Sequence, residues 1–252
     1  MLASIDAEEE MTILVVGASG ATGRLLVEDL LNRGQRVRTV VRSPEKLPET
    51  LRNHHLLSIV HANLLDLSDD EMTQQVSDCI AVASCLGHNL SFKGIYGSPR
   101  RLVAVATRRL CEAVRATRPH HPVRFVLMNT AGNRNRELDE PISFGQRCVI
   151  GLIRLLLPPH IDNEMAADYL RVNVCQNDSA IEWVVVRPDT LVNEDSVIEY
   201  EAHPSPTRSA IFNAGKTSRI NVSHFMADLI TGDDIWRRWQ GQMPVIYNKG
   251  FS

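Results

Sequence analysis

Thr12-Ile-Leu-Val-Val-Gly-Ala-Ser-Gly-Ala-Thr-Gly23 is the stretch that decides the fold of this chain. A short apolar run opens into three glycines, and a helical pattern over residues 24–33 follows at once. The run predicts a buried parallel strand. Gly17, Gly20 and Gly23 permit a sharp turn, a close approach of backbone N–H groups to a pyrophosphate, and tight packing of the helix on the strand. An ordinary strand-to-helix turn with chance glycines is the alternative, but the complete strand, turn and helix favour a dinucleotide-binding turn.

The end of the next predicted strand, residues 37–41, bears on the choice between the two nicotinamide cofactors. NAD-selective sites usually carry an acid here, because a carboxylate accepts hydrogen bonds from the ribose 2′-OH and repels a 2′-phosphate. This strand ends instead in Arg42, followed by Ser43 and Lys46, which together make a reasonable 2′-phosphate clamp. We therefore expect NADP(H) to be preferred over NAD(H). An ordinary solvated charge at a strand end is the alternative interpretation of Arg42.

The composition fits a soluble globular enzyme or binding protein. The chain has 252 residues, 44% of them hydrophobic, and a formal net charge of −3, which allows one large α/β domain with a small appended region. The negative charge argues against nucleic-acid binding, because no basic excess is present to hold a phosphate backbone. The 5 cysteines form no CxxC pair. This usage is typical of free thiols in a reducing compartment, and we expect a cytoplasmic protein.

The sequence shows no targeting or membrane-spanning pattern. Residues 1–10 are rich in acids and lack a basic or apolar stretch, so we expect a flexible N-terminal tail rather than a signal peptide. The most apolar later stretch, residues 149–157, is interrupted by Arg154 and halted by Pro158 and Pro159. It is far shorter than the roughly 20 residues of a spanning helix. We expect no membrane span.

Strand and helix patterns alternate along the rest of the chain. Further strands are predicted at residues 56–60, 80–85, 124–128 and 183–186. The alternation predicts an α/β protein with a doubly wound parallel sheet, the Rossmann fold, over residues 11–252, with ligands bound beyond the carboxyl ends of the strands. Residues 133–163 and 191–218 break the alternation, and we expect them to supply the walls of a second-substrate pocket.

Further motifs accompany the glycine stretch. They are Arg42-Ser-Pro-Glu-Lys46, Asn63-Leu-Leu-Asp66, Phe125-Val-Leu-Met-Asn-Thr-Ala-Gly132, Trp183-Val-Val-Val-Arg-Pro188 and Ser218-Arg-Ile-Asn-Val222. With them the chain resembles, over nearly its whole length, the short-chain dehydrogenase/reductase superfamily. The resemblance is to the atypical NmrA-like, NAD(P)H-binding branch, which includes flavin and biliverdin reductases and redox-sensing regulators.

The resemblance implies positions for the cofactor. Those positions are Ser19, Ala21 and Thr22 at the phosphates, Asn63 and Leu64 beside the adenine, and Leu86 and Gly87 near the nicotinamide ribose. Asn63 stands where family members often have Asp. Arg187, inside the Val-Arg-Pro motif, is expected to help shape the cofactor pocket or to brace the C-terminal loop.

The acid/base pair of the better-known members is missing. Those members use Tyr-x-x-x-Lys, in which the lysine charge lowers the tyrosine pKa and the phenol transfers a proton to or from the substrate oxygen. Here the residues four positions after the tyrosines are Arg100, Asn173, Pro204 and Phe251. Met165 stands where the atypical branch often places a lysine. Reduction of an ordinary ketone, which needs a tuned proton donor, is therefore disfavoured.

Two side chains, Asn129 and Thr130, are candidate catalytic residues, and two histidines are candidates for binding the substrate. Asn129 and Thr130 follow a predicted strand where the family commonly has serines, although simple strand termination by local side-chain to backbone bonds is an alternative. His88 and His160 are candidate substrate-binding residues. A hydrogen-bonded loop histidine and a helix that packs on the core explain these two as well. No HExxH motif or Cys/His spacing indicates a metal site.

Two functions from different classes remain open. The first is an NADPH-dependent reductase that passes hydride to a small-molecule redox acceptor such as a flavin or quinone, since these acceptors stabilise negative charge themselves and take a proton from water. The second is a non-catalytic NAD(P)-sensing regulator. A nucleoside-sugar or isoprenoid epimerase or reductase ranks third, because it normally requires the missing acid/base groups. The sequence favours the reductase and leaves the oligomeric state open.

Overall fold

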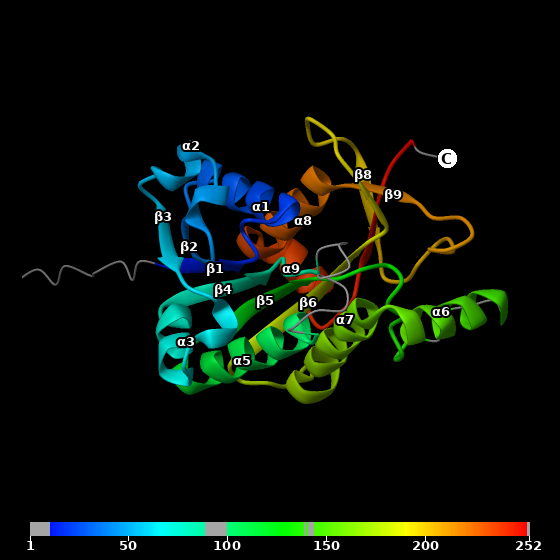
Figure 1. Ribbon diagram of the computed structural model, residues 1–252, viewed down its shortest axis with the longest axis horizontal. Coiled ribbons are helices and arrows are strands. Elements are labelled where there is room, and N and C mark those ends of the chain that lie inside the picture. Colours follow the sequence, from blue (N-terminus) through cyan, green and yellow to red (C-terminus); the bar gives the residue numbers. More distant parts are fainter. Residues whose placement is uncertain (1–10, 89–99, 139, 141–143, 251–252) are drawn as a thin grey trace, which may run out of the picture.

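A computed structural model describes residues 11–88, 100–138, 140 and 144–250 (Figure 1). The strands of its main sheet are β1 (Thr12–Val16), β2 (Arg36–Val41), β3 (Leu57–His61), β4 (Cys79–Ser84), β5 (Val123–Met128), β6 (Ile181–Pro188), β8 (Tyr200–His203) and β10 (Val245–Asn248). A separate parallel pair consists of β7 (Thr190–Val192) and β9 (Lys216–Ser218). The expected N-terminal tail, residues 1–10, lies outside the described residues.

The strand order is that of a doubly wound sheet. It reads β3-β2-β1-β4-β5-β6-β10-β8, with parallel neighbours except for the antiparallel pair of β10 and β8. The predicted Rossmann fold is therefore confirmed, and each predicted strand overlaps an observed one. Because the chain leaves β1 toward β2 and later returns on the other side to β4, the ligand crevice is expected at the carboxyl ends of β1 and β4.

Helices cover both faces of the sheet. They are α1 (Ala21–Asn32), α2 (Glu49–Arg52), α3 (Asp69–Val76), α5 (Leu102–Thr117), α6 (Phe144–Leu156), α7 (Pro158–Tyr169), α8 (Arg219–Thr231) and α9 (Asp233–Trp239). Short turns of other helix types lie at η1 (Pro44–Lys46), η2 (Leu64–Asp66) and η3 (Leu170–Val174). Figure 1 shows α1 and α8 on one side of the sheet and α3, α5 and α7 on the other.

The central strand shows why its sequence is a continuous apolar run. Ile13 and Val15 are buried in the cluster that includes α1, α8 and α9, whereas Leu14 and Val16 are buried in the cluster of α3, α5 and α7. Successive side chains of a strand point to opposite faces. A strand covered on both faces must therefore be apolar at every position.

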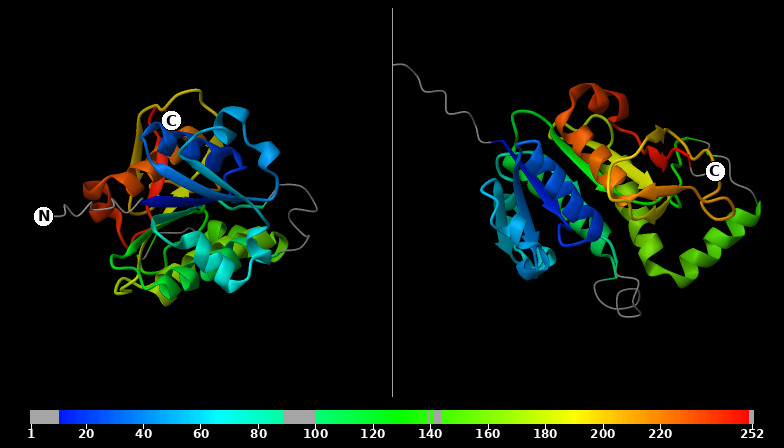
Figure 2. Two further views of the ribbon diagram at one scale, coloured as in Figure 1. Left: turned by 90° about the vertical axis from the view of Figure 1, so that its left-hand side faces the viewer. Right: turned by 90° about the horizontal axis from the view of Figure 1, so that it is seen from above.

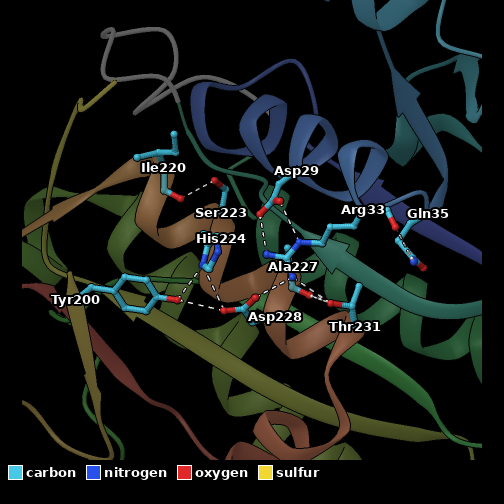
Figure 3. Close-up of polar contacts among 10 residues, drawn as sticks. All are labelled: Asp29, Arg33, Gln35, Tyr200, Ile220, Ser223, His224, Ala227, Asp228 and Thr231. Carbon is cyan, nitrogen blue, oxygen red and sulfur yellow. Dashed lines mark hydrogen bonds and ion pairs between the residues drawn. The ribbon is translucent and has the colours of Figure 1, made fainter. Parts of the chain in front are cut away.

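A polar network joins α1 to α8 and to β8 (Figure 3). Arg33, just after α1, donates from Nε to Asp29 at 2.9 Å and from Nη1 to Asp228 of α8 at 2.7 Å. The hydroxyl of Tyr200 on β8 donates to Asp228 at 3.3 Å and lies 3.0 Å from Nδ1 of His224. Burial, followed by the charge of Asp228, raises the pKa of Tyr200, so its hydroxyl keeps its proton. We call these residues the α1–α8 clasp.

α6 extends away from the sheet and meets α7 at an elbow (Figures 1 and 2). It begins beside the segment after β8, since a Cβ on Gly145 would lie 3.7 Å from the ring of Phe212. Its outer surface carries the exposed side chains of Leu152 and Leu156. Within residues 11–88, 100–138 and 144–250, every helix is too short or too polar to cross a bilayer.

Candidate cofactor and acceptor site

The glycine turn, residues 17–23, lies where the strand order reverses. Gly17 has a φ of +81°, and a Cβ there would lie 2.6 Å from the carbonyl carbon of Cys85, just past β4. A Cβ on Gly23 would overlap the carbonyl oxygen of Gly17. Gly17 therefore makes the turn and lets β1 approach β4, while Gly23 lets α1 approach the end of β1.

The N-terminus of α1 is built to receive an anion. Gly20 is its N-cap, no side chain caps the helix, and its first turn holds no acid. Ser19, Gly20 and Ala21 are exposed, whereas Thr22 is only 5% exposed and can offer its backbone N–H but little of its side chain. The open N–H groups and the positive end of the helix dipole suit a pyrophosphate.

The 2′-phosphate clamp, Arg42, Ser43 and Lys46, follows β2 and includes one unexpected acid. Arg42 and Lys46 are exposed, and His61 Nε2 lies 3.1 Å from the carbonyl oxygen of Arg42. The turn η1 brings Glu45 back onto this group. A hydrogen bond from its own backbone N–H, then one from the Ser43 hydroxyl and the charges of His61 and Lys46, lower the pKa of Glu45 despite an opposing effect of desolvation. Its carboxylate therefore competes with a 2′-phosphate for the same donors.

The expected adenine and nicotinamide positions differ in accessibility. Asn63 is exposed, and its amide donates to Asp66 at 2.8 Å, while Leu64 is buried in the core. Beyond β4, Leu86 is half-buried and Gly87 is exposed, with open space within 4 Å of the point where a Cβ would lie. Asn63 and Gly87 are thus accessible at the expected adenine and nicotinamide ends of the cofactor, whereas Leu64 has little accessible surface.

His88 is tied to two helices by a buried carboxylate. Its Nε2 lies 2.7 Å from Oδ2 of Asp162 on α7, and the Asp162 side chain is 0% exposed. The same carboxylate accepts hydrogen bonds from the backbone N–H groups of Val103 and Ala104 at the start of α5, at 2.8 and 2.9 Å. Asp162 therefore fixes the His88 ring beside the carboxyl end of β4. Sequence reasoning did not identify Asp162.

Thr130 and His160 both lie close to one glycine, Gly132. A Cβ on Gly132 would lie 3.7 Å from Oγ1 of Thr130 and 3.5 Å from Cε1 of His160. Thr130 Oγ1 accepts a hydrogen bond from the Gly132 N–H at 3.3 Å. Its hydroxyl can still donate to a ligand, because one oxygen accepts and donates at once.

Asn129 has a local structural role. Its amide nitrogen donates to the carbonyl oxygen of Asn163 at 2.9 Å, and its Oδ1 accepts from the backbone N–H of Thr130 at 2.9 Å. The side chain is almost wholly buried. These bonds agree with the strand-termination alternative for Asn129, and they join the end of β5 to α7.

Arg187 is a buried structural residue. Its side chain is 0% exposed, and its Nη2 donates to Oε1 of Glu140 at 2.7 Å. Its other bonds reach the carbonyl oxygens of Met243 at 2.6 Å, Asn133 at 2.8 Å and Pro204 at 3.2 Å. The side chain has no accessible surface, which agrees with the bracing alternative for Arg187 rather than with a direct cofactor contact. Its bonds join the segments at residues 133, 140, 204 and 243.

Glu164 holds α6 and α7 together beside His160. Its carboxylate accepts hydrogen bonds from Arg154 at 2.8 and 3.0 Å and lies 3.3 Å from His160 Nε2. Burial raises the pKa of Glu164, but the hydrogen bonds and charges of His160 and Arg154 outweigh it and lower the pKa to about 2. The carboxylate is therefore charged throughout the physiological range.

This lowered pKa predicts a loss of stability in acid. The unfolded-state value is 4.5, so the contribution of Glu164 is complete above that pH and disappears as the pH falls toward 2. Glu164→Gln should lower the free energy of unfolding at pH 7 by about 1–2 kcal/mol and flatten its dependence on pH in that window, as measured by urea unfolding. Glu112→Gln, in an exposed pair with Arg108, is the control. An unchanged pH slope in Glu164→Gln would contradict the assignment.

Comparison with known proteins identifies the family. A family model for NAD(P)H-binding proteins matches residues 17–233. The chain belongs to the NAD(P)H-binding family. The matched region begins at the glycine turn, just after β1, and ends just past α8, so it includes the strands from β2 to β9. This family match supports the expected binding of a nicotinamide cofactor.

Solved structures share the fold of this NAD(P)H-binding protein. A short-chain dehydrogenase/reductase from Veillonella parvula in complex with NADP has 15% identity and a TM-score of 0.68, with 96% of each chain covered. The oxidoreductase ylbE from Lactococcus lactis has 17% identity and a TM-score of 0.67, covering 96% of this chain and 93% of that one. ChuY, an anaerobillin reductase from Escherichia coli, has 15% identity and a TM-score of 0.67, covering 96% and 99%. No curated protein sequence matches the chain.

Proposed function

We propose that this NAD(P)H-binding protein is an NADPH-dependent reductase that passes hydride to a planar redox acceptor such as a flavin or a quinone. The observation that carries the proposal is a cavity of about 230 Å³ beside Gly132. We call it the acceptor cavity. Its walls come from Ala131, Gly132, Arg134 and Glu140, from Ile150 on α6 and from residues 206–210, within or next to the segments 133–163 and 191–218.

The proposed roles follow from the positions of the side chains. The amides at the start of α1 bind the pyrophosphate, and Arg42 and Lys46 bind the 2′-phosphate. Thr130 donates a hydrogen bond to the acceptor, and His160, which also lies close to Gly132, contacts the acceptor as well. The bound nicotinamide supplies the hydride. Met165 carries no proton to donate, which favours acceptors that stabilise charge themselves over the epimerase alternative.

The regulator remains the second candidate, because α6 and α7 expose apolar side chains. Leu152, Leu156 and Ile161 are 55%, 51% and 40% exposed. Exposed apolar surface of this kind is typical of protein contacts. A sensor would bind the dinucleotide and present this surface to a partner without turnover.

An assay of the purified protein with NADPH and a panel of flavins and quinones distinguishes the reductase from the regulator. For a reductase we expect loss of absorbance at the reduced nicotinamide band, faster than in a mixture without protein. Calorimetry of NADPH binding is run in parallel. Binding without turnover across the whole panel would overturn the reductase and support the sensor.

The preference for NADPH is tested at Arg42. Arg42→Asp removes a charge-assisted hydrogen bond and adds repulsion, so we expect NADPH affinity to fall at least about tenfold and NADH affinity to change much less. Arg36→Asp, at the opposite end of β2, makes the same change in charge and serves as the control. Glu45→Gln should strengthen NADPH binding, because it removes the competing carboxylate. Equal losses of both cofactors in Arg42→Asp would remove Arg42 from the clamp.

We also propose that the protein works in a reducing compartment such as the cytoplasm. Cys79, Cys85, Cys111 and Cys175 are free. Burial raises the pKa of Cys79 to about 11 and that of Cys85 to about 12, so these thiols stay protonated at neutral pH, whereas Cys175 is exposed. A free exposed thiol is typical of proteins in reducing surroundings.

A further inference from the structure

His160 lies in the first turn of α7, next to a glycine that lines the acceptor cavity. A Cβ on Gly132 would lie 3.5 Å from Cε1 of His160 and 3.7 Å from Oγ1 of Thr130. Both distances are ordinary van der Waals contacts. The missing side chain of Gly132 therefore leaves a space between the cavity and two polar side chains, and a ligand atom in that space would touch both.

Hydrogen bonds hold this part of α7 against the sheet and against α5. Asn129, just past the end of β5, donates to the carbonyl oxygen of Asn163 at 2.9 Å. The carboxylate of Asp162 accepts hydrogen bonds from two backbone N–H groups at the start of α5, at 2.8 and 2.9 Å. The His160 ring, two residues earlier in the same helix, is therefore positioned before a ligand binds.

The two nitrogens of the His160 ring differ in their surroundings. Nε2 is buried and lies 3.3 Å from Oε1 of Glu164, one turn later in α7. Nδ1 has no hydrogen-bond partner among the described residues. Both nitrogens are bonded to Cε1, the ring atom beside Gly132. An Nε2–H directed at Glu164 therefore leaves Nδ1 to meet a ligand, and the side chain, 12% exposed, is shielded but accessible.

Glu164 favours the charged form of the His160 ring. Burial raises the pKa of Glu164, but the hydrogen bonds and charges of His160 and Arg154 outweigh it and lower the pKa to about 2. The attraction is mutual, so the carboxylate stabilises a protonated imidazole. The other charged groups on the packed elements are Arg154 on α6, which shares this carboxylate, and Arg134, Glu140 and Arg208 along the cavity.

We propose that His160, positioned by Glu164, gives a proton to an oxygen of the reduced acceptor in the space left by Gly132. This inference rests on the reductase function proposed above. Thr130 donates a hydrogen bond to the same oxygen. His160 and Glu164 thus carry out the proton transfer for which the better-known members use Tyr-x-x-x-Lys.

The step balances with a quinone as the acceptor. A hydride adds two electrons and one proton to the quinone and leaves a hydroquinone anion. The Nδ1–H bond of the His160 imidazolium then breaks, its proton passes to the anionic oxygen, and the ring keeps the electron pair. Water returns a proton to Nδ1 before the next turnover.

The pH dependence of quinone reduction tests the proton donor. With NADPH and a soluble quinone, we expect kcat to fall as the pH rises and the His160 ring loses its proton. His160→Gln keeps a polar side chain that cannot ionise, so kcat in mild acid should fall at least about tenfold and this pH dependence should disappear. The KM for NADPH should not change. His121→Gln, an exposed position just before β5, is the control.

Glu164→Gln tests the positioning role. It removes the negative charge beside Nε2, so the fall of kcat should move to lower pH. Glu164→Asp keeps the charge and should restore part of the original profile. A merely structural role would lower kcat at every pH without moving the profile, and this result would overturn the role of Glu164. Thermal unfolding checks that each variant folds.

Gly132→Ala tests where the acceptor binds. The added methyl group makes only ordinary contacts, so we expect stability and NADPH affinity to stay unchanged. It fills the space beside Thr130 and His160, however, and kcat for the quinone should fall at least about tenfold. Gly151→Ala is the matched control, because Gly151 on α6 has open space around the position of a Cβ.

Two results would overturn the inference and leave the reductase intact. They are an unchanged pH profile in His160→Gln and an unchanged kcat in Gly132→Ala. If no quinone is reduced, the reductase itself fails for quinones, and an NMR titration of the histidine ring protons then tests the pair. A His160 signal that shifts with added quinone and titrates at lower pH in Glu164→Gln would support a ligand-facing ring held by Glu164. Absence of both changes would overturn it.

Discussion

Gly17→Ala is expected to abolish cofactor binding and to lower the free energy of unfolding by about 2–5 kcal/mol. The φ of +81° costs roughly 1–2 kcal/mol for a residue with a Cβ. The new Cβ would also lie 2.6 Å from the backbone of Cys85 and 2.8 Å from that of Leu86, an overlap that typically costs about 1–3 kcal/mol. Since these atoms are backbone, the end of β4 must move, and the expected nicotinamide side of the site moves with it.

Gly34→Ala separates these two causes. Gly34 has a φ of +75°, but no atom lies within 4 Å of a Cβ built there. The Gly34→Ala variant should have a free energy of unfolding about 1 kcal/mol lower and an unchanged affinity for NADPH. Urea unfolding and calorimetric titration with NADPH measure both quantities in both variants. If both substitutions changed stability and NADPH affinity equally, the close contact between the ends of β1 and β4 would contribute to neither.

Arg187→Met is expected to lower the free energy of unfolding by about 3–5 kcal/mol, because it leaves the carboxylate of Glu140 buried without its partner. Glu140 is 5% exposed and Arg187 0% exposed, so water cannot replace the lost ion pair. The loops that form the acceptor cavity also lose the hydrogen bonds by which Arg187 joins Asn133, Glu140 and Pro204. We therefore expect weaker acceptor binding as well.

A double variant tests this explanation. Arg187→Met/Glu140→Gln removes the unpaired buried carboxylate and should recover part of the stability that Arg187→Met loses. Arg108→Met, which breaks an exposed pair with Glu112, should change stability by less than about 1 kcal/mol. Urea unfolding compares all three. An Arg187→Met protein as stable as the unaltered chain would show that the ion pair contributes nothing to the fold.

The central fold could be predicted because its signals are local. The run from Thr12 to Val16 is apolar at every position after the first, and the structure buries it on both faces. The glycines that follow are required by close contacts within the turn itself, apart from Gly17, which is also required by the nearby backbone of Cys85. The strands β7, β8, β9 and β10 were not predicted, because strands of three or four residues depend on distant partners rather than on their own pattern.

The parts of the candidate site that could be predicted are those formed by residues close together in the sequence. The partner of His88 is Asp162, 74 residues later, and that of Arg187 is Glu140, 47 residues earlier. No sequence spacing indicates such pairs. Glu45 lies inside a quoted motif, yet its competition with the clamp appears only because η1 folds it back onto Ser43.

The α1–α8 clasp has a consequence for protein engineering. The helix that receives the nucleotide is secured by residues contributed almost two hundred positions later, so the two halves of the chain do not behave as exchangeable modules. A chimaera that grafts the acceptor half of a relative onto this nucleotide half would bring a foreign α8 against α1. Grafts of this kind should succeed when Asp29, Arg33 and Asp228 come from the same parent.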